Sequence, residues 1–136
     1  AQARHDVLAV VREAGAATGA TAEAEVLVAR GEQELAGGCS TAARELFVAA
    51  AALAPIGATA WNNLAVLAHE RGEPGALELV DSALFAAPDD IDVIVNRAII
   101  QLHRGDRAGA VAGARRAAEL HPGSPIVADL LALTGC

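Results

Sequence analysis

The chain has 136 residues, 54% of them hydrophobic, and a formal net charge of −7 at neutral pH. Lysine is absent and the arginines form no basic stripe, so the composition does not favour binding to nucleic acid or to anionic membranes. No apolar run approaches the roughly eighteen residues of a membrane-spanning helix. Much of the hydrophobic content is alanine, the best helix former, which favours a single all-α domain. Cytoplasm is the default location.

Three segments share one spaced signature: a small residue, a bulkier one four positions later, an alanine after three more and a proline after five more. The steps of four and three place the first three members on one face of a helix, and the proline ends that helix. A repeat of 33 or 34 residues with helical spacing inside it is typical of stacked helix pairs. The members are Ala43, Phe47, Ala50 and Pro55, then Ala76, Val80, Ala83 and Pro88, and then Ala110, Ala114, Ala117 and Pro122.

In chain order, the pattern predicts eight helices. An N-terminal helix falls within residues 1–20, three helix pairs lie in the units 24–57, 58–90 and 91–124, and a C-terminal helix occupies 125–136. Glycines predicted to end the first helix of each pair, because glycine adopts positive φ at helix C-termini, are Gly38, Gly72 and Gly105. Small residues predicted where the first helix crosses the second are Gly31, Ala65 and Ala98.

The spacing resembles that of the tetratricopeptide repeat family, whose unit carries W-x2-L-G-x2-Y, then A-x3-F and a late proline. The middle unit matches best, with Trp61, Leu64, Ala65 and Ala68 in its first helix. The resemblance covers essentially the whole chain. It implies an all-α, right-handed α-solenoid of three tetratricopeptide-type helix pairs with an extra helix at each end.

The resemblance further implies that the first helices line a concave groove that binds a peptide or partner segment. Asn63 and Asn96 share a register two residues before the small crossing residue, where amides can pair with the backbone of an extended peptide. The alternative is that each amide is merely solvated or bonded locally. We expect the peptide to be mainly apolar or mildly basic, because the chain is acidic. The predicted groove residues are Asn62, Asn63, Val66, His69, Val95, Asn96, Ile99 and His103.

Other functions lack their residues. One variant of the family grips a carboxylate with basic residues and asparagine, but Val28, Glu32 and Asp92 occupy those positions here. His69 and His103 lie on separate helices with no cysteine to complete a metal site. We find no phosphate-binding loop and no nucleophile–base combination. The sequence therefore predicts a non-catalytic protein–protein interaction scaffold without cofactor or metal.

Two other interpretations stay open. The chain can be a substrate-recruiting accessory domain of a larger enzyme, such as a transferase, or a self-assembling structural repeat protein. The C-terminal segment bears on the second, because it is apolar around most of its circumference while one helix packs only one side. We expect self-association there, through Ile126, Leu130 and Leu133.

Overall fold

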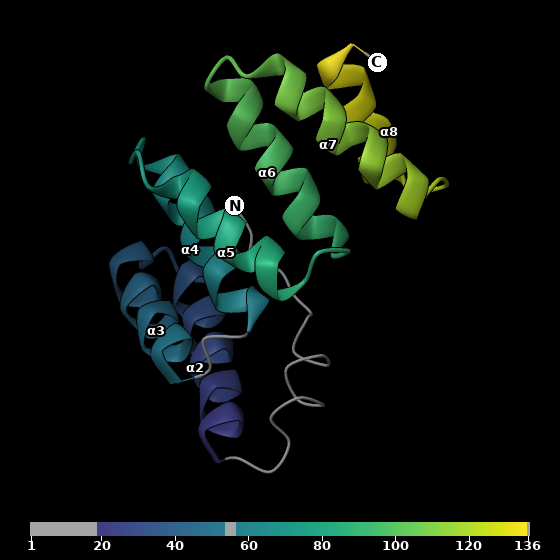
Figure 1. The fold of residues 1–136 in the computed structure, drawn as a ribbon. Helices are drawn as coiled ribbons and strands as arrows, with labels where there is room; N and C mark the ends of the chain where they lie inside the picture. The colour runs from purple at the N-terminus through teal and green to yellow at the C-terminus, as the bar shows by residue number, and fades with distance from the viewer. Residues whose placement is uncertain (1–18, 54–56, 136) are drawn as a thin grey trace.

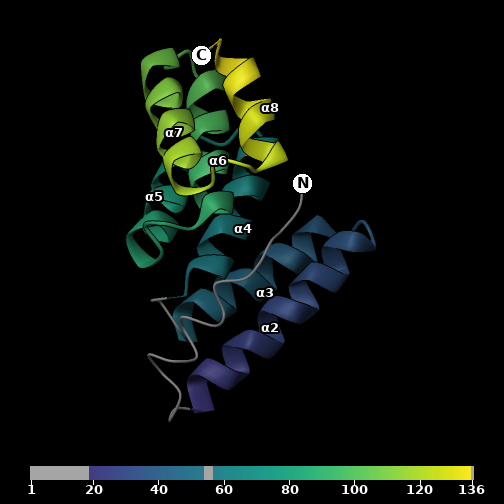
Figure 2. The ribbon, with the colours of Figure 1, turned by 90° about the vertical axis from the view of Figure 1, so that its right-hand side faces the viewer.

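The computed structural model describes residues 19–53 and 57–135. This part of the chain contains helices and no strand, as predicted, and the helices stack as pairs in chain order (Figure 1). Figure 2 shows α2 and α3 at one end of the stack and α6 to α8 at the other. The helices are α2 (Gly19–Ala36), α3 (Ser40–Leu53), α4 (Ala58–Glu70), α5 (Ala76–Ala86), α6 (Ile91–His103), α7 (Arg107–Leu120) and α8 (Pro125–Thr134).

The N-terminal boundary differs from the predicted one. The helix α2 begins at Gly19 rather than at Ala24, so it includes residues 19 and 20, which the sequence pattern assigned to an N-terminal helix. The rest of that predicted helix, residues 1–18, lies outside the described residues, as does Pro55.

The ends of the helices follow from local chemistry. Gly38, Gly72 and Gly105 have φ values of 87°, 71° and 85° after α2, α4 and α6. A Cβ would meet nothing within 4 Å at any of the three, so the positive φ, not lack of space, requires glycine there. Pro88 and Pro122 follow α5 and α7, and the residue before each has left the helical conformation, with ψ values of 78° at Ala87 and 70° at His121.

The spaced signature forms the core. Its nine described non-proline members are all at most 1% exposed, including Ala114, the weak substitute for the bulky residue. The signature positions therefore bury one face of α3, α5 and α7 against the first helices of the pairs. Trp61, at the start of α4, packs against the clusters of both the first and the second pair and joins them.

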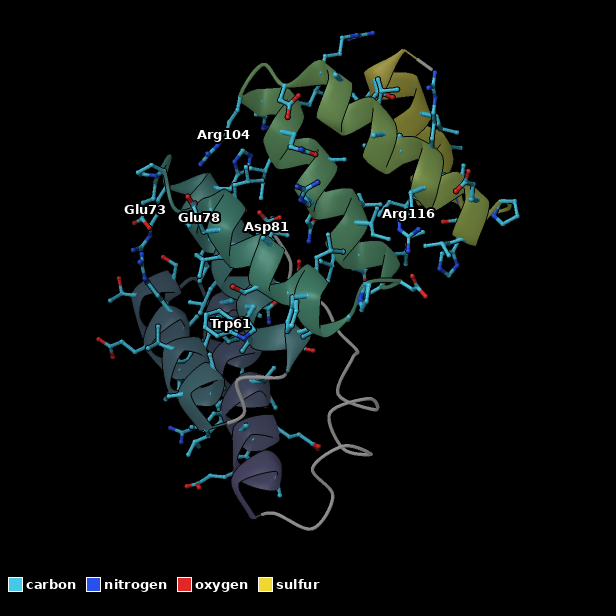
Figure 3. All side chains as sticks on the ribbon, viewed as in Figure 1. Trp61, Glu73, Glu78, Asp81, Arg104 and Arg116 are labelled. Carbon is cyan, nitrogen blue, oxygen red and sulfur yellow. The ribbon has the colours of Figure 1, made fainter. Side chains whose placement is uncertain are left out.

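Polar contacts repeat along the turns between helices. Arg71, after α4, donates to Ser40 and Thr41 at the start of α3. Arg104, in the equivalent place after α6, donates to the backbone carbonyl of Pro74 at 2.7 Å, and Figure 3 shows it reaching toward the turn that contains Glu73. Each of these arginines thus ties the end of one first helix to the preceding pair.

The stacking gives the array an inner and an outer side. Among the first helices, α4 packs on α6 and α6 packs on α8, whereas α4 meets the first pair mainly through α3. Packing among the second helices α3, α5 and α7 is weaker within the described residues. An array whose first helices approach more closely curves toward them, so α4 and α6 lie on its inner side.

Candidate peptide-binding groove

The inner side carries two polar contacts between α4 and α6. The Nδ2 atom of Asn96 donates to Oδ1 of Asn62 at 3.1 Å. Seven residues, or about two helical turns, further along each helix, Nε2 of His69 lies 2.8 Å from Nδ1 of His103. Both pairs join residues 34 positions apart, so they repeat the same relation between the two helices.

Apolar side chains lie between these two contacts. Val66 follows Asn62 by four residues and precedes His69 by three. On α6, Ile99 follows Asn96 by three residues and precedes His103 by four, and part of its side chain packs against the cluster of Val95, Ala98 and Leu130. Val66 and Ile99 are both half-buried. We call the strip made by Asn62, Val66 and His69 on α4 and by Asn96, Ile99 and His103 on α6 the inner face. It offers amide, aliphatic and imidazole groups in that order.

Two predicted groove residues do not lie on the inner face. Asn63 is 1% exposed, and Val95 is 2% exposed within a cluster that contains Ala98, Ala110 and Leu130. The reason is helical geometry, because successive residues of a helix are about 100° of rotation apart. Asn62 faces α6, and Asn63 therefore points into the hydrophobic interior. The shared register predicts that Asn63 and Asn96 bind the backbone of a peptide side by side, but Asn96 instead donates to Asn62 and Asn63 lies in the interior.

The remaining predicted residues differ in access. Asn62 is buried by its contact with Asn96, whereas Asn96 and His69 are half-buried and His103 is exposed. The surface open to a partner on the inner face therefore consists of Val66, His69, Asn96, Ile99 and His103.

The environment of His69 favours its neutral form. Burial lowers the pKa of His69 below 6.5, and the neighbouring His103 and Arg104 lower it further. Glu70 acts in the opposite direction, because its carboxylate stabilises a protonated ring. At neutral pH the imidazole ring of His69 is thus an uncharged hydrogen-bonding group.

Charge along the first helices is mainly negative. Acidic side chains number four on α2 and one each on α4, α6 and α8, against one arginine on α2 and one on α6. The arginine on α6, Arg97, donates through Nε to Asp81 of α5 at 2.6 Å. The first helices taken together are therefore net negative, mainly through α2, whereas Arg104 adds a positive charge beside His69.

A second surface was not predicted. A cavity of about 360 Å³ is lined by Trp61, Asp81, Ser82 and Phe85, and Phe85 is 91% exposed. Figure 3 labels Trp61 and Asp81 on this side of α5. The repeat period relates Phe85 to Ala52 and Glu119 in the other units, and both of these residues are exposed. An aromatic residue at an exposed repeat position marks a surface, not the core.

The predicted self-association surface on α8 is partly wrong. Leu130 is 1% exposed and packs in the cluster with Val95 and Ala98, so it belongs to the core. Ile126 and Leu133, seven residues apart on one face, are exposed. Only these two of the three predicted residues are available to another molecule.

No group of three or more His, Cys, Asp or Glu side chains in the described part of the chain is placed to hold a metal ion. Of the helices described, none combines the length and the apolar character that crossing a membrane requires. What the inner face offers chemically is hydrogen bonding and apolar contact.

Comparisons with known proteins find similar structures but no similar sequence. No protein-family model matches this sequence, and no curated protein matches it either. Among solved structures, the first tetratricopeptide domain of Spaghetti (RPAP3), bound to the HSP90 peptide SRMEEVD, is similar with a TM-score of 0.77 and 16% identity, over 83% of this chain and 90% of that one.

Two bacterial structures are similar as well. The Yersinia enterocolitica type III secretion chaperone SycD, in complex with a peptide of the translocator YopD, has a TM-score of 0.72 and 18% identity, over 82% of this chain and 91% of that one. The Thermobaculum terrenum O-GlcNAc transferase has a TM-score of 0.79 and 20% identity, but this chain covers only 23% of it. Identities this low relate the folds alone, so the chain has the tetratricopeptide-repeat fold, as its spacing predicted.

Proposed function

We propose that this chain is a non-catalytic protein-interaction scaffold that binds an extended peptide or partner segment on the inner face of α4 and α6. The observation that carries the proposal is the arrangement on that face, where half-buried Val66 and Ile99 lie between an amide pair and an imidazole pair. Aliphatic groups can bury alternate side chains of a peptide, and polar groups at both ends can bind its backbone. Two proteins of the same fold were solved with peptides bound.

The proposed ligand is apolar to mildly basic. Acidic side chains predominate along the first helices, and a peptide with lysine or arginine beside its apolar residues complements that charge. In this proposal Ile99 and Val66 contact the peptide side chains, while Asn96 contacts the backbone. Asn63 supports the fold from the interior instead of touching the ligand.

The test begins with peptides selected on the folded protein from a random displayed library, with affinity measured by titration calorimetry. Ile99→Glu should weaken binding at least tenfold, because a carboxylate would replace an apolar contact. Phe85→Glu is the matched control, since it makes the same kind of change at an exposed residue outside the inner face. If Phe85→Glu weakens binding and Ile99→Glu does not, the ligand binds beside Trp61 and the proposal is wrong.

A separate variant tests whether the side-chain amide of Asn96 contributes to peptide binding. Asn96→Ala should reduce affinity. It should also lower the melting temperature, because it leaves the buried Oδ1 of Asn62 without its donor, so affinity is compared at a temperature where the variant is fully folded. The double variant Asn63→Ala, Asn96→Ala should bind no more weakly than Asn96→Ala alone, after correction for lost stability. Unchanged affinity in Asn96→Ala would remove the amide from the binding site.

A further inference from the structure

The contact between His69 and His103 has the geometry of a shared proton. Their facing nitrogens are 2.8 Å apart, the ring centroids are 4.9 Å apart, and the ring planes differ by 17°. The nitrogens are much closer together than the ring centres, so each nitrogen points at the edge of the other ring. This is an N–H···N hydrogen bond between rings in nearly parallel planes, not a face-to-face stack.

Such a bond depends on the number of protons on the pair. In the neutral pair, one facing nitrogen donates and the other accepts. One additional proton can bind to the outer nitrogen of the donor ring, which leaves the bond in place. A second additional proton must bind to the accepting nitrogen, which removes the acceptor and leaves two positive rings side by side.

We propose that the histidine pair is a proton-sensitive contact that holds α4 against α6 at neutral pH and parts in acid, when both rings are protonated. The pair is one of two side-chain hydrogen bonds that join these helices at an interval of seven residues, and the other runs from Asn96 to Asn62. Loss of the histidine contact removes a hydrogen bond between the C-terminal ends of α4 and α6. The surroundings of Val66 and Ile99, which lie between the amide pair and the histidine pair along α4 and α6, should then change.

The charges around the pair favour release in acid. Arg104, just after α6, faces His69 and opposes a positive charge on it, as does His103 itself. Glu70 on α4 is the group that favours the charge. Arg104 is held by the carbonyl groups of Glu73 and Pro74 before α5, so it stays near the histidines. Arginine remains charged throughout the pH range in question, so the doubly protonated pair has a third positive group beside it.

Acid release would regulate the proposed peptide site: the part of the inference that concerns affinity rests on the proposed function. Parting α4 from α6 alters the strip that would contact the peptide, so affinity should fall as the pH falls. The contact between the histidines can be tested without any ligand, and its failure would leave the proposed function standing.

The direct experiment is nitrogen-15 NMR of the imidazole rings of the full chain from about pH 8 to about pH 4.5. We expect one N–H linking the two facing nitrogens near neutral pH, with coupling across the hydrogen bond. That signal should disappear on acidification, together with shifts of the Val66 and Ile99 methyl groups at the same midpoint. Two histidines that titrate independently, with no coupling at any pH, would overturn the proposal.

Thermal unfolding provides the second readout. Between about pH 7.5 and about pH 5, wild type should lose at least about 3 °C more in melting temperature than the double variant His69→Gln, His103→Gln, which cannot be protonated. His121→Gln is the control, because it removes an exposed histidine after α7 that lies outside the inner face. It should behave as wild type does. Equal acid sensitivity of wild type and the double variant would contradict the proposal.

Discussion

Gly31 on α2 and Phe47 on α3 approach so closely that a methyl group at position 31 would lie 2.5 Å from Cε1 of the phenylalanine ring. Two more ring atoms would be within 3.0 Å. Because Phe47 is fully buried, its ring has no open space to move into. The first helix pair is thus held together by a contact that only glycine allows, and the spacing of the sequence had placed a small residue at this crossing.

Substitution of this glycine gives the first prediction. Gly31→Ala gains about 1 kcal/mol of helix propensity, but overpacking a rigid core typically costs about 1–3 kcal/mol. We expect a net loss of up to about 2 kcal/mol in the free energy of unfolding, measured by urea denaturation. Gly37→Ala is the control, since the nearest atom to its Cβ would be 3.6 Å away. A Gly31→Ala variant as stable as Gly37→Ala would show that the helices separate easily here.

The crossing of α6 and α7 gives a second prediction. Ala98 is fully buried, and its Cβ would lie 3.2 Å from a Cβ at Gly113 on α7. Ala98→Leu should therefore destabilise the protein by about 1–3 kcal/mol or more. Ala112→Leu, at an exposed position on α7, should stay within about 0.5 kcal/mol of wild type. Equal melting of the two variants would refute the assigned crossing.

The third prediction separates core from surface on α8. Leu130→Glu buries a carboxylate among apolar side chains, so we expect a loss of several kcal/mol or an unfolded helix. Leu133→Glu changes an exposed side chain and should alter stability by no more than about 0.5 kcal/mol. Circular dichroism melts distinguish the two results. Similar melts would mean that α8 packs on another face.

The same exposed face tests self-association. We expect copies of the chain to associate weakly through Ile126 and Leu133, because exposed apolar side chains on one helix face are typical of interfaces. Sedimentation at tens of micromolar, roughly the range suited to weak contacts, should show larger species for wild type than for Leu133→Glu. A wild-type chain that stays monomeric there would contradict this expectation.

The fourth prediction concerns charge near the inner face. Arg104 lowers the pKa of His69, so Arg104→Gln should raise it toward 6.5, whereas Glu70→Gln should lower it further. With the pKa of His69 raised in the folded state, less stability is lost as the pH falls below 6.5. Proton NMR of the His69 ring measures both shifts. Arg71→Gln, whose side chain bonds to Ser40 and Thr41 instead, should leave the His69 titration unchanged.

The repeat period predicts which residues of a helix pack in the core, but it does not predict the contacts between neighbouring helix pairs. Spacing within a unit sets the rotational phase of one helix, and it correctly placed Ala43, Phe47 and Ala50, with their equivalents, in the core. Contacts between neighbouring units depend on how far one pair slides past the next, which spacing does not encode. Asn63 lies about 100° of rotation from Asn62 on α4 and so falls in the interior, while the slide between pairs brings Asn62 to Asn96 and His69 to His103.

The end of the array was harder to predict for a related reason. The apolar residues of α8 surround the helix, so no amphipathic pattern indicates which side packs. Only the positions of α6 and α7 decide that Val127 and Leu130 turn inward while Leu133 turns outward. For Phe85, in contrast, the sequence holds a signal, because its equivalent in the third unit is the charged Glu119, which indicates a surface position.

The central claim is that the inner face of α4 and α6 binds peptide, and NMR shift mapping with a library-selected peptide tests it most directly. Methyl and side-chain amide signals of the full chain would be followed as the peptide is added. We expect the largest changes at Val66, Ile99 and Asn96, with Phe85 and Leu53 unaffected. The largest changes at Phe85 and Trp61, with Ile99 unmoved, would contradict it.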